Sequence, residues 1–141
     1  QLGIPATFIN SSLDGYETAR RFQEIDRQQY RLLYIAPERF IMPDFIQAMK
    51  RWNVRMIAID EAHCISQWGH DFRPSYLQMA NQLDQLPNRP VIVALTATAT
   101  VQVAADIKRL LKIPENNHIQ TGFERENLRF QVIKDQKKNN I

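Results

Sequence analysis

The sequence predicts an α/β domain whose mainly parallel sheet is flanked by helices. Short apolar runs alternate along the chain with segments of helical periodicity, and this order favours βα units. The three middle runs, LLYIA, MIAID and VIVAL, are almost continuously apolar and rich in β-branched residues. Strands with one solvated face would alternate with polar residues, so both faces of the sheet are expected to be covered.

Five runs have the length and composition of strands. They are Ala6–Ile9, Arg31–Ala36, Met56–Asp60, Val91–Thr96 and His118–Thr121. Between them, four helices are indicated by apolar residues at helical spacing, with a cap before them or a proline beside them. The stripes are Ala19, Phe22 and Ile25 after the capping pair Asp14 and Glu17; Phe45, Ile46, Met49 and Trp52 after Pro43; Leu77, Ala80 and Leu83 before Pro87; and Val103, Ile107, Leu110 and Leu111 before Pro114.

The composition is that of one globular domain. The 141 residues are 44% hydrophobic and 23% charged, and no apolar run approaches the roughly 20 residues that cross a bilayer. No signal-like leader indicates secretion. Cys64 is the one cysteine, which excludes an internal disulfide and fits a reducing, intracellular location. The net charge of +3 does not by itself predict a nucleic-acid-binding face, because residues 134–141, with three lysines and one aspartate, carry +2 of it.

Two carboxylates follow the third predicted strand directly. In open α/β sheets, function collects beyond the carboxyl ends of strands, and Asp60 and Glu61 stand at such an end. There an aspartate can hold Mg²⁺ through water, and a glutamate can polarise the water that attacks a phosphate. For the pair alone, capping of the next helix is the simpler interpretation.

An aromatic loop comes next. Residues 64–74 carry Trp68, His70, Phe72 and Arg73 around Gly69, and Pro74 ends the stretch. Aromatic rings beside an arginine suit base stacking and phosphate contact. The alternative is that the aromatic rings pack into the core.

The tetrad Asp60-Glu61-Ala62-His63 is the DEAH form of the Walker B motif, and the stretch from Ile59 to Tyr76 resembles the RecQ family of superfamily 2 helicases. The resemblance implies a RecA-like, P-loop NTPase fold that uses ATP and Mg²⁺. It implies that Asp60 positions Mg²⁺, that Glu61 is the base, and that His63 relays the state of the site. The residues that sense single-stranded DNA would be Gln67, Trp68, His70, Asp71, Phe72 and Arg73.

Two further stretches match the family in the same order. Ile35–Phe40 resembles motif Ib, which places Pro37, Glu38 and Arg39 along the DNA backbone. Leu95–Thr100 resembles motif III, which makes Thr96, Ala97 and Thr98 the link between the ATP and DNA sites. Taken alone, the first could be a helix start and the second a helix cap; order and spacing favour the family interpretation.

The resemblance implies a DNA helicase of recombination and repair that acts on junctions of single-stranded and duplex DNA, in the bacterial nucleoid or the nucleus. Residues 1–122 would form the C-terminal part of the first RecA-like domain. Residues 123–141 would begin a linker, partly disordered, to the second. The rival interpretations are a non-catalytic α/β interaction domain on a helicase scaffold and an RNA helicase of the DEAH kind. The Gln67–Pro74 loop favours the RecQ type over the RNA enzymes.

A phosphate-binding loop is missing from the sequence. None of the four glycines is followed by lysine, so no Gly-Lys-Ser/Thr turn exists. In the RecQ family this loop and its strand precede the position of Gln1. We therefore expect the isolated chain to be inactive and the sheet to have a gap between Val91–Thr96 and His118–Thr121. The last segment should be misplaced, detached or supplied by another molecule.

Overall fold

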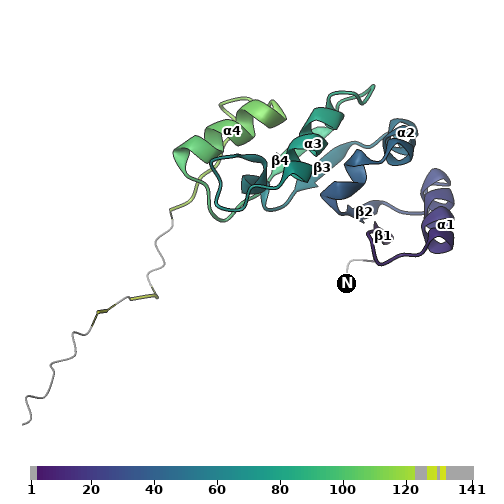
Figure 1. The fold of residues 1–141 in the computed structure, drawn as a ribbon, viewed down its shortest axis with the longest axis horizontal. Coiled ribbons are helices and arrows are strands. Elements are labelled where there is room, and N and C mark those ends of the chain that lie inside the picture. The colour runs from purple at the N-terminus through teal and green to yellow at the C-terminus, as the bar shows by residue number, and fades with distance from the viewer. Residues whose placement is uncertain (1–2, 123–126, 130, 133–141) are drawn as a thin grey trace, which may run out of the picture.

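The computed structural model describes residues 3–122, 127–129 and 131–132. Strands and helices alternate through them, as predicted (Figure 1). Their order is β1 (Ala6–Ile9), α1 (Gly15–Asp26), β2 (Leu32–Ile35), the 3-10 helix η1 (Pro37–Ile41), α2 (Pro43–Arg51), β3 (Met56–Ile59), the 3-10 helix η2 (Ala62–Ile65), α3 (Pro74–Leu83), β4 (Val91–Ala94) and α4 (Val101–Leu111).

The strands pair in parallel, which confirms the predicted α/β class. β1 pairs with β2 in a register that sets Phe8 beside Tyr34, and β3 pairs with β4 with Met56 beside Val91. Each pair is joined by a crossover that contains a helix, α1 in the first and α3 in the second. Among the described strands no ladder joins the two pairs, so the sheet is divided into two-stranded pieces.

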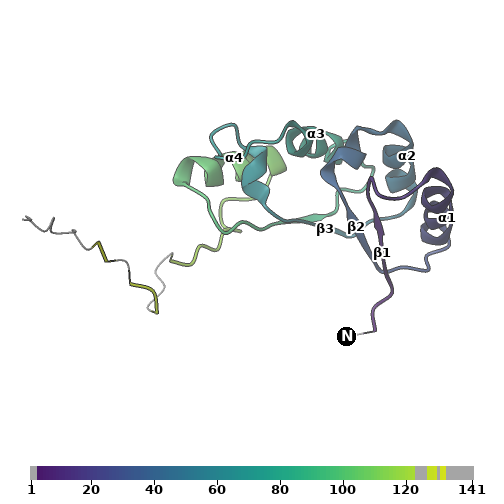
Figure 2. The same ribbon diagram turned by 60° about the horizontal axis from the view of Figure 1, so that its bottom comes forward.

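The prediction that both faces of the sheet are covered is wrong for this structure. In β1, Thr7 and Ile9 are buried whereas Ala6 and Phe8 are exposed, and in β2 Tyr34 is exposed as well. Figure 2 shows α2, α3 and α4 along one side of the strands. Continuous apolar strands have two apolar faces, and here a helical layer covers one of them.

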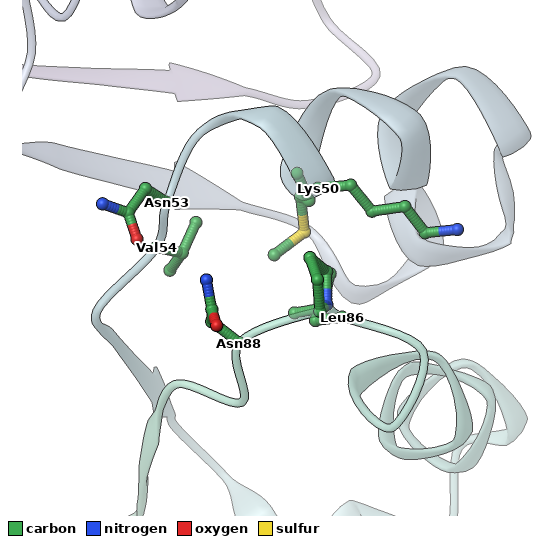
Figure 3. Close-up of a pocket in the computed structure, with 7 residues that line it drawn as sticks. Lys50, Asn53, Val54, Leu86 and Asn88 are labelled. Carbon is green, nitrogen blue, oxygen red and sulfur yellow. The ribbon is translucent and has the colours of Figure 1, made fainter.

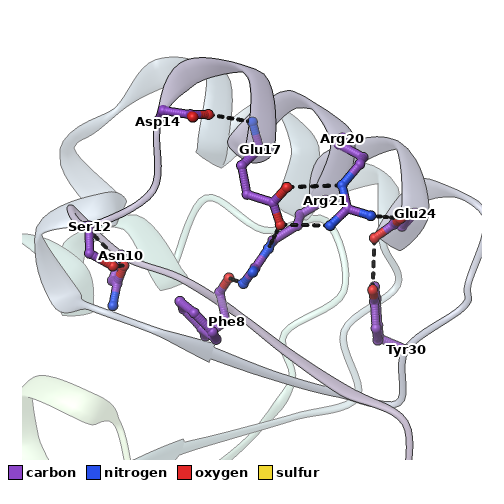
Figure 4. A network of polar contacts seen from close by, with 9 residues as sticks. All are labelled: Phe8, Asn10, Ser12, Asp14, Glu17, Arg20, Arg21, Glu24 and Tyr30. Carbon is purple, nitrogen blue, oxygen red and sulfur yellow. Dashed lines mark hydrogen bonds and ion pairs between the residues drawn. The ribbon is translucent and has the colours of Figure 1, made fainter.

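Helix α1 begins as its capping pair predicts. The Asp14 carboxylate accepts a hydrogen bond from the backbone N–H of Glu17 at 2.7 Å (Figure 4). The Glu17 carboxylate accepts from the guanidinium groups of Arg20 and Arg21, and these pairs lower the pKa of Glu17 to about 2. Arg21 also lies over the Phe8 ring, 4.1 Å from its centroid, and thereby ties α1 to β1.

An aromatic cluster joins the first half of the chain to the helical layer. The ring of Phe45 in α2 lies 5.5 Å from that of Phe40 in η1 and 6.3 Å from that of Phe22 in α1, centroid to centroid. Trp52 closes the group, 5.4 Å from Phe22. Phe40 and Phe45 are almost completely buried, and the core continues from them through Ile59 to α3 and α4. This packing holds β3 and the residues that follow it.

The predicted strand at His118–Thr121 is not formed. These residues have no regular secondary structure, and Ile119 is 93% exposed. A strand needs a neighbour for its backbone hydrogen bonds, and no described strand lies beside this segment. Of the three expected alternatives, a segment that is misplaced, detached or supplied by another molecule, the structure shows the detached one. Most of the predicted linker, 123–141, lies outside the described residues, and the boundary at 122 stays a prediction.

In the part of the chain that the structure describes, no helix is both long and apolar enough to cross a membrane.

A small pocket lies between the end of α2 and the turn after α3, lined by Lys50, Asn53, Val54, Leu86 and Asn88 among others (Figure 3). It lies where β3 and β4 begin, whereas Asp60 lies where β3 ends. The pocket is therefore separate from the carboxyl edge at which the predicted site residues gather.

Candidate active site

The carboxyl ends of β3 and β4 hold the candidate site together. The backbone N–H of Leu95 donates to the carbonyl of Ile59 at 2.8 Å, and the N–H of Ala62 donates to the carbonyl of Leu95 at 2.9 Å. The DEAH turn and the threonine-rich stretch are thus bonded side by side.

The two acidic residues lie on the surface of this edge. Glu61 has left-handed backbone angles, φ 49° and ψ 41°, which few residues other than glycine adopt. The sharp turn leaves the Glu61 side chain 59% exposed while the residues of η2 behind it are buried. The Asp60 carboxylate accepts from the N–H of Glu61 at 2.9 Å, and the Tyr76 hydroxyl donates to the carbonyl of Asp60 at 3.2 Å. Both carboxylates can therefore reach a ligand outside the sheet.

His63 connects the acidic pair to the threonine-rich stretch. Its imidazole is buried, and Nδ1 lies 3.0 Å from Thr96 Oγ1 and 3.3 Å from Glu61 Oε2. Thr96 Oγ1 also accepts from the N–H of Thr98 at 3.3 Å. Thr98 thus reaches the histidine through its backbone, and Ala97 is exposed with no side-chain polar group. One buried ring therefore contacts both Glu61 and Thr96.

The aromatic loop packs directly against the same histidine. The rings of His63 and His70 are stacked, 4.7 Å apart and inclined by 14°. Cys64 Sγ lies 3.7 Å from His63 Nε2 and donates to Asp71 Oδ2 at 3.8 Å. Asp71 also accepts from Arg73 at 2.6 Å, and this guanidinium lowers the pKa of Asp71 below its usual range. Burial, and then the Asp71 charge, raise the pKa of the Cys64 thiol.

The remaining loop side chains point outward to different degrees. Trp68 is 71% exposed, so the interpretation that it packs into the core is wrong. Gln67 and Arg73 are exposed, whereas Phe72 is half-buried. Backbone bonds close the loop, from Gly69 to the Ser66 carbonyl at 3.0 Å and from Arg73 to the Cys64 carbonyl at 2.9 Å. These bonds fix the loop backbone, and the exposed indole of Trp68 projects from it.

The predicted motif Ib residues make contacts within the protein. Pro37 opens η1, and Glu38 accepts from the Ser75 hydroxyl at 3.1 Å. Arg39 donates to the carbonyl of Asn10 at 2.5 Å, which ties η1 to the end of β1. These bonds hold η1 against its neighbours. The bond from Ser75 also joins η1 to the start of α3, where the neighbouring Tyr76 donates to the carbonyl of Asp60.

The residues of this site lie in a region that matches a known protein family. The family model described as DEAD/DEAH box helicase matches residues 2–107, most of the chain. The chain belongs to the DEAD/DEAH box helicase family. The Asp60–His63 tetrad is thus the DEAH box of a helicase-family domain.

Three relatives indicate the branch of the family. The chain is 47% identical over 98% of its length to the ATP-dependent DNA helicase RecQ of Bacillus subtilis, and 42% identical over 91% to that of Haemophilus influenzae. It is 38% identical over 94% to a protein of Acanthamoeba polyphaga mimivirus that is named as an ATP-dependent RNA helicase. The chain spans 23%, 20% and 24% of these three relatives, so each of them contains much more than this helicase-family segment.

The DEAH box suits a hydrated divalent cation. Asp60 is exposed, and among the described residues no basic side chain forms an ion pair with it. Mg²⁺ keeps most of its waters and takes one or two carboxylates, which fits Asp60 at this edge. A second group, His63, Cys64 and Asp71, brings three ligand atoms within 4.8 Å of one another. Arg73 already neutralises Asp71, and the Cys64 thiol donates to it, so this group is satisfied by its own hydrogen bonds.

Three residues of this helicase-family site could not be found from sequence. Tyr76 reaches Asp60 from α3, Ser66 lies completely buried under the loop, and Asp106 approaches Ser66 from α4. Their contacts join positions far apart in the chain, and no local pattern marks them. The burial of Ser66 becomes a signal only once the fold is known.

Proposed function

We propose that this chain is part of the ATP-hydrolysing domain of a RecQ-type DNA helicase. The observation that supports this most is the position of His63. One imidazole contacts Glu61 of the DEAH box, Thr96 of the stretch after β4 and His70 of the aromatic loop. An enzyme that hydrolyses ATP only when DNA is bound needs such a connection.

Each side chain of the site has a separate role in ATP hydrolysis or DNA contact. Asp60 holds hydrated Mg²⁺, which supplies positive charge to the phosphates when bound. Glu61 accepts a proton from the water that attacks the terminal phosphate of ATP. His63 responds to Glu61 on one side and orients Thr96 on the other. Trp68 stacks on an unpaired DNA base, and Arg73, already fixed by Asp71, lies beside it for phosphate contact.

The first test replaces the base. In a protein that contains this chain together with a phosphate-binding loop, Glu61→Gln should abolish steady-state ATP hydrolysis while ATP binding is retained, because the amide cannot accept the proton. Glu115→Gln is the matched control, since that carboxylate binds Lys108 at the end of α4. Retained turnover in Glu61→Gln would reject the assignment of the base.

The second test replaces the indole. Trp68→Ala should reduce the stimulation of ATP hydrolysis by single-stranded DNA more than it reduces the basal rate. Stacking is worth about 1–3 kcal/mol per base, so the concentration of DNA for half-maximal stimulation should rise about fivefold or more. Trp68→Phe keeps an aromatic face and should retain most of the effect. An equal fall of both rates in Trp68→Ala would make the loop a structural element only.

Experiments on the same protein, which contains this chain and a phosphate-binding loop, also test two alternative functions. The name of the mimivirus relative favours an RNA substrate, and strand displacement on matched DNA and RNA duplexes decides between them. A non-catalytic interaction domain would bind nucleic acid or protein without any Glu61-dependent hydrolysis. Participation in recombination and repair, and action at junctions with a second RecA-like domain, belong to the same proposal.

The 141-residue chain alone should not hydrolyse ATP. It has no Gly-Lys-Ser/Thr turn to hold the phosphates, and Asp60 by itself binds Mg²⁺ weakly because the triphosphate supplies other ligands. The measurement is phosphate release with and without single-stranded DNA. DNA-stimulated release that is lost in Glu61→Gln would contradict this expectation.

A further inference from the structure

A buried serine ties the aromatic loop to helix α4. Ser66 is completely buried, and its hydroxyl donates to Asp106 Oδ2 at 2.7 Å. Ser66 Oγ also accepts from the backbone N–H of Trp68 at 3.2 Å. The hydroxyl thus uses its donor for α4 and its acceptor for the loop. Two hydrogen bonds in series lead from an acidic side chain on α4 to the backbone of the exposed tryptophan.

Helix α4 begins immediately after the threonine-rich stretch. Thr100 caps it by accepting from the N–H of Val103 at 3.3 Å, and the helix buries Val103, Ile107 and Leu111. Asp106 lies on the side of α4 that faces η2, and its side chain is 13% exposed. A helix moves as a rigid element, so a displacement of residues 96–100 reaches Asp106 without passing through His63.

Asp106 is held as an ionised acceptor. Arg109 donates to its other oxygen at 2.8 Å, and the bonds from Arg109 and from Ser66 lower its pKa. Arg109 is largely exposed, so water can replace it, whereas the Ser66 hydroxyl has no access to water. A hydrogen bond to a charged acceptor is stronger than one between neutral groups. The bond from Ser66 to Asp106 is therefore the one that fixes the loop.

We propose that Asp106 is a positioning residue that couples the Thr96–Thr98 stretch, through α4 and Ser66, to the orientation of Trp68. It acts on the reaction only through the loop and touches no substrate. The inference rests on the proposed function, since Trp68 is taken to contact DNA. It adds a second connection beside the contact between His63 and Thr96, and it enters the loop at Ser66, before His70 in the chain.

The test uses four variants of the protein that contains this chain and a phosphate-binding loop. Asp106→Ala should lower the stimulation of ATP hydrolysis by single-stranded DNA about tenfold or more, the size expected for the loss of one hydrogen bond to a charged group, with the basal rate changed less than about twofold. Ser66→Ala should do the same, and the double variant should be no worse than either single one. Asp106→Asn keeps an acceptor for Ser66 and should retain most of the stimulation.

A second readout follows the loop without ATP or DNA. In protein labelled with 5-fluorotryptophan, the ¹⁹F resonance of Trp68, assigned by its loss in Trp68→Phe, should shift and sharpen in Asp106→Ala. The matched control is Glu115→Ala, which removes an exposed carboxylate paired with Lys108 of the same helix and should leave both readouts unchanged. If Asp106→Ala does not fold, Ser66→Ala gives the same two measurements.

The outcomes separate this inference from the proposed function. If the unmodified protein shows no DNA-stimulated hydrolysis, the proposed function fails, and the ¹⁹F signal still reports whether Asp106 holds the loop. Unchanged stimulation and an unchanged Trp68 signal in Asp106→Ala would overturn the inference. Additive losses in the double variant would overturn it too, because they would show that Ser66 and Asp106 act separately.

Discussion

Gly69 lies where a larger residue has no room. A Cβ at this position would lie 2.6 Å from the carbonyl oxygen of His63 and 3.1 Å from that of Ser66, and neither backbone atom can move freely. We expect Gly69→Ala to displace the loop and to destabilise the protein by about 1–3 kcal/mol, the cost typical of overpacking. Unfolding in urea and the DNA-stimulated rate measure the two effects.

The control for this substitution is Gly15→Ala. Gly15 is the first residue of α1, and no atom lies within 4 Å of an added Cβ. This variant should be as stable as the parent or slightly more stable, because alanine favours a helix. If Gly69→Ala behaves in the same way, the close approach at His63 has no energetic consequence.

Cys64 should be an unreactive thiol in the folded protein. Its side chain is buried and donates to Asp71, and burial together with the Asp71 charge raises its pKa. Because the thiolate is the reactive form, a disulfide reagent at neutral pH should modify Cys64 slowly until denaturant unfolds the chain. A raised pKa in the folded state stabilises the fold below the ordinary thiol pKa, and this contribution is lost as the pH rises through the folded value. Rapid labelling of the folded protein would contradict the burial.

At the scale of elements, the aromatic cluster joins α1, η1 and α2. Phe45 lies at its centre and is 1% exposed. Phe45→Ala removes a buried ring that three elements share, and should cost about 3–5 kcal/mol of unfolding free energy. Tyr16→Ala is the matched control on α1, where the ring is 80% exposed, and should change stability by less than about 0.5 kcal/mol. Urea unfolding followed by circular dichroism compares the two.

Local signals predicted the helices and the first four strands well. Asp14 caps α1, Pro43 opens α2 and Thr100 caps α4, all of which are properties of short sequence windows. Pro74, taken in the sequence as the end of the aromatic loop, is instead the first residue of α3. The wrong prediction of a strand at His118–Thr121 has a non-local cause. An apolar segment forms a strand only when a neighbouring strand accepts its hydrogen bonds, and sequence alone does not say which neighbours are present.

For the candidate site, too, sequence predicted the local features and missed the tertiary contacts. Asp60, Glu61 and His63 are adjacent in sequence, so their position after β3 could be predicted from the strand itself. Their link to Thr96 followed from the family pattern and from the rule that parallel strands end at one edge. The stacking of His63 on His70 and the bond from Ser66 to Asp106 could not be predicted, because tertiary packing decides which side chain a loop turns inward.

At the scale of the whole molecule, each strand pair presents an apolar surface. Tyr34, Met56 and Val91 are 62%, 60% and 66% exposed, although all three lie within strands. Apolar patches larger than a few hundred Å² are rare on monomeric proteins and bind other apolar molecules. We therefore expect the 141-residue chain to bind an anilinonaphthalene dye under native conditions and to self-associate as its concentration rises.

We expect the dye to bind the exposed strand faces and not a partly unfolded chain. Substitutions can distinguish these two explanations. Met56→Lys and Tyr34→Lys place charge on the exposed faces, and should reduce both dye fluorescence and the apparent mass in gel filtration without lowering the midpoint of urea unfolding. Ile119→Lys changes an apolar side chain that is even more exposed but lies outside the strands, and should alter neither. Dye binding that persists in the double lysine variant, or that rises with a loss of stability, would show that the dye reports a loosened core.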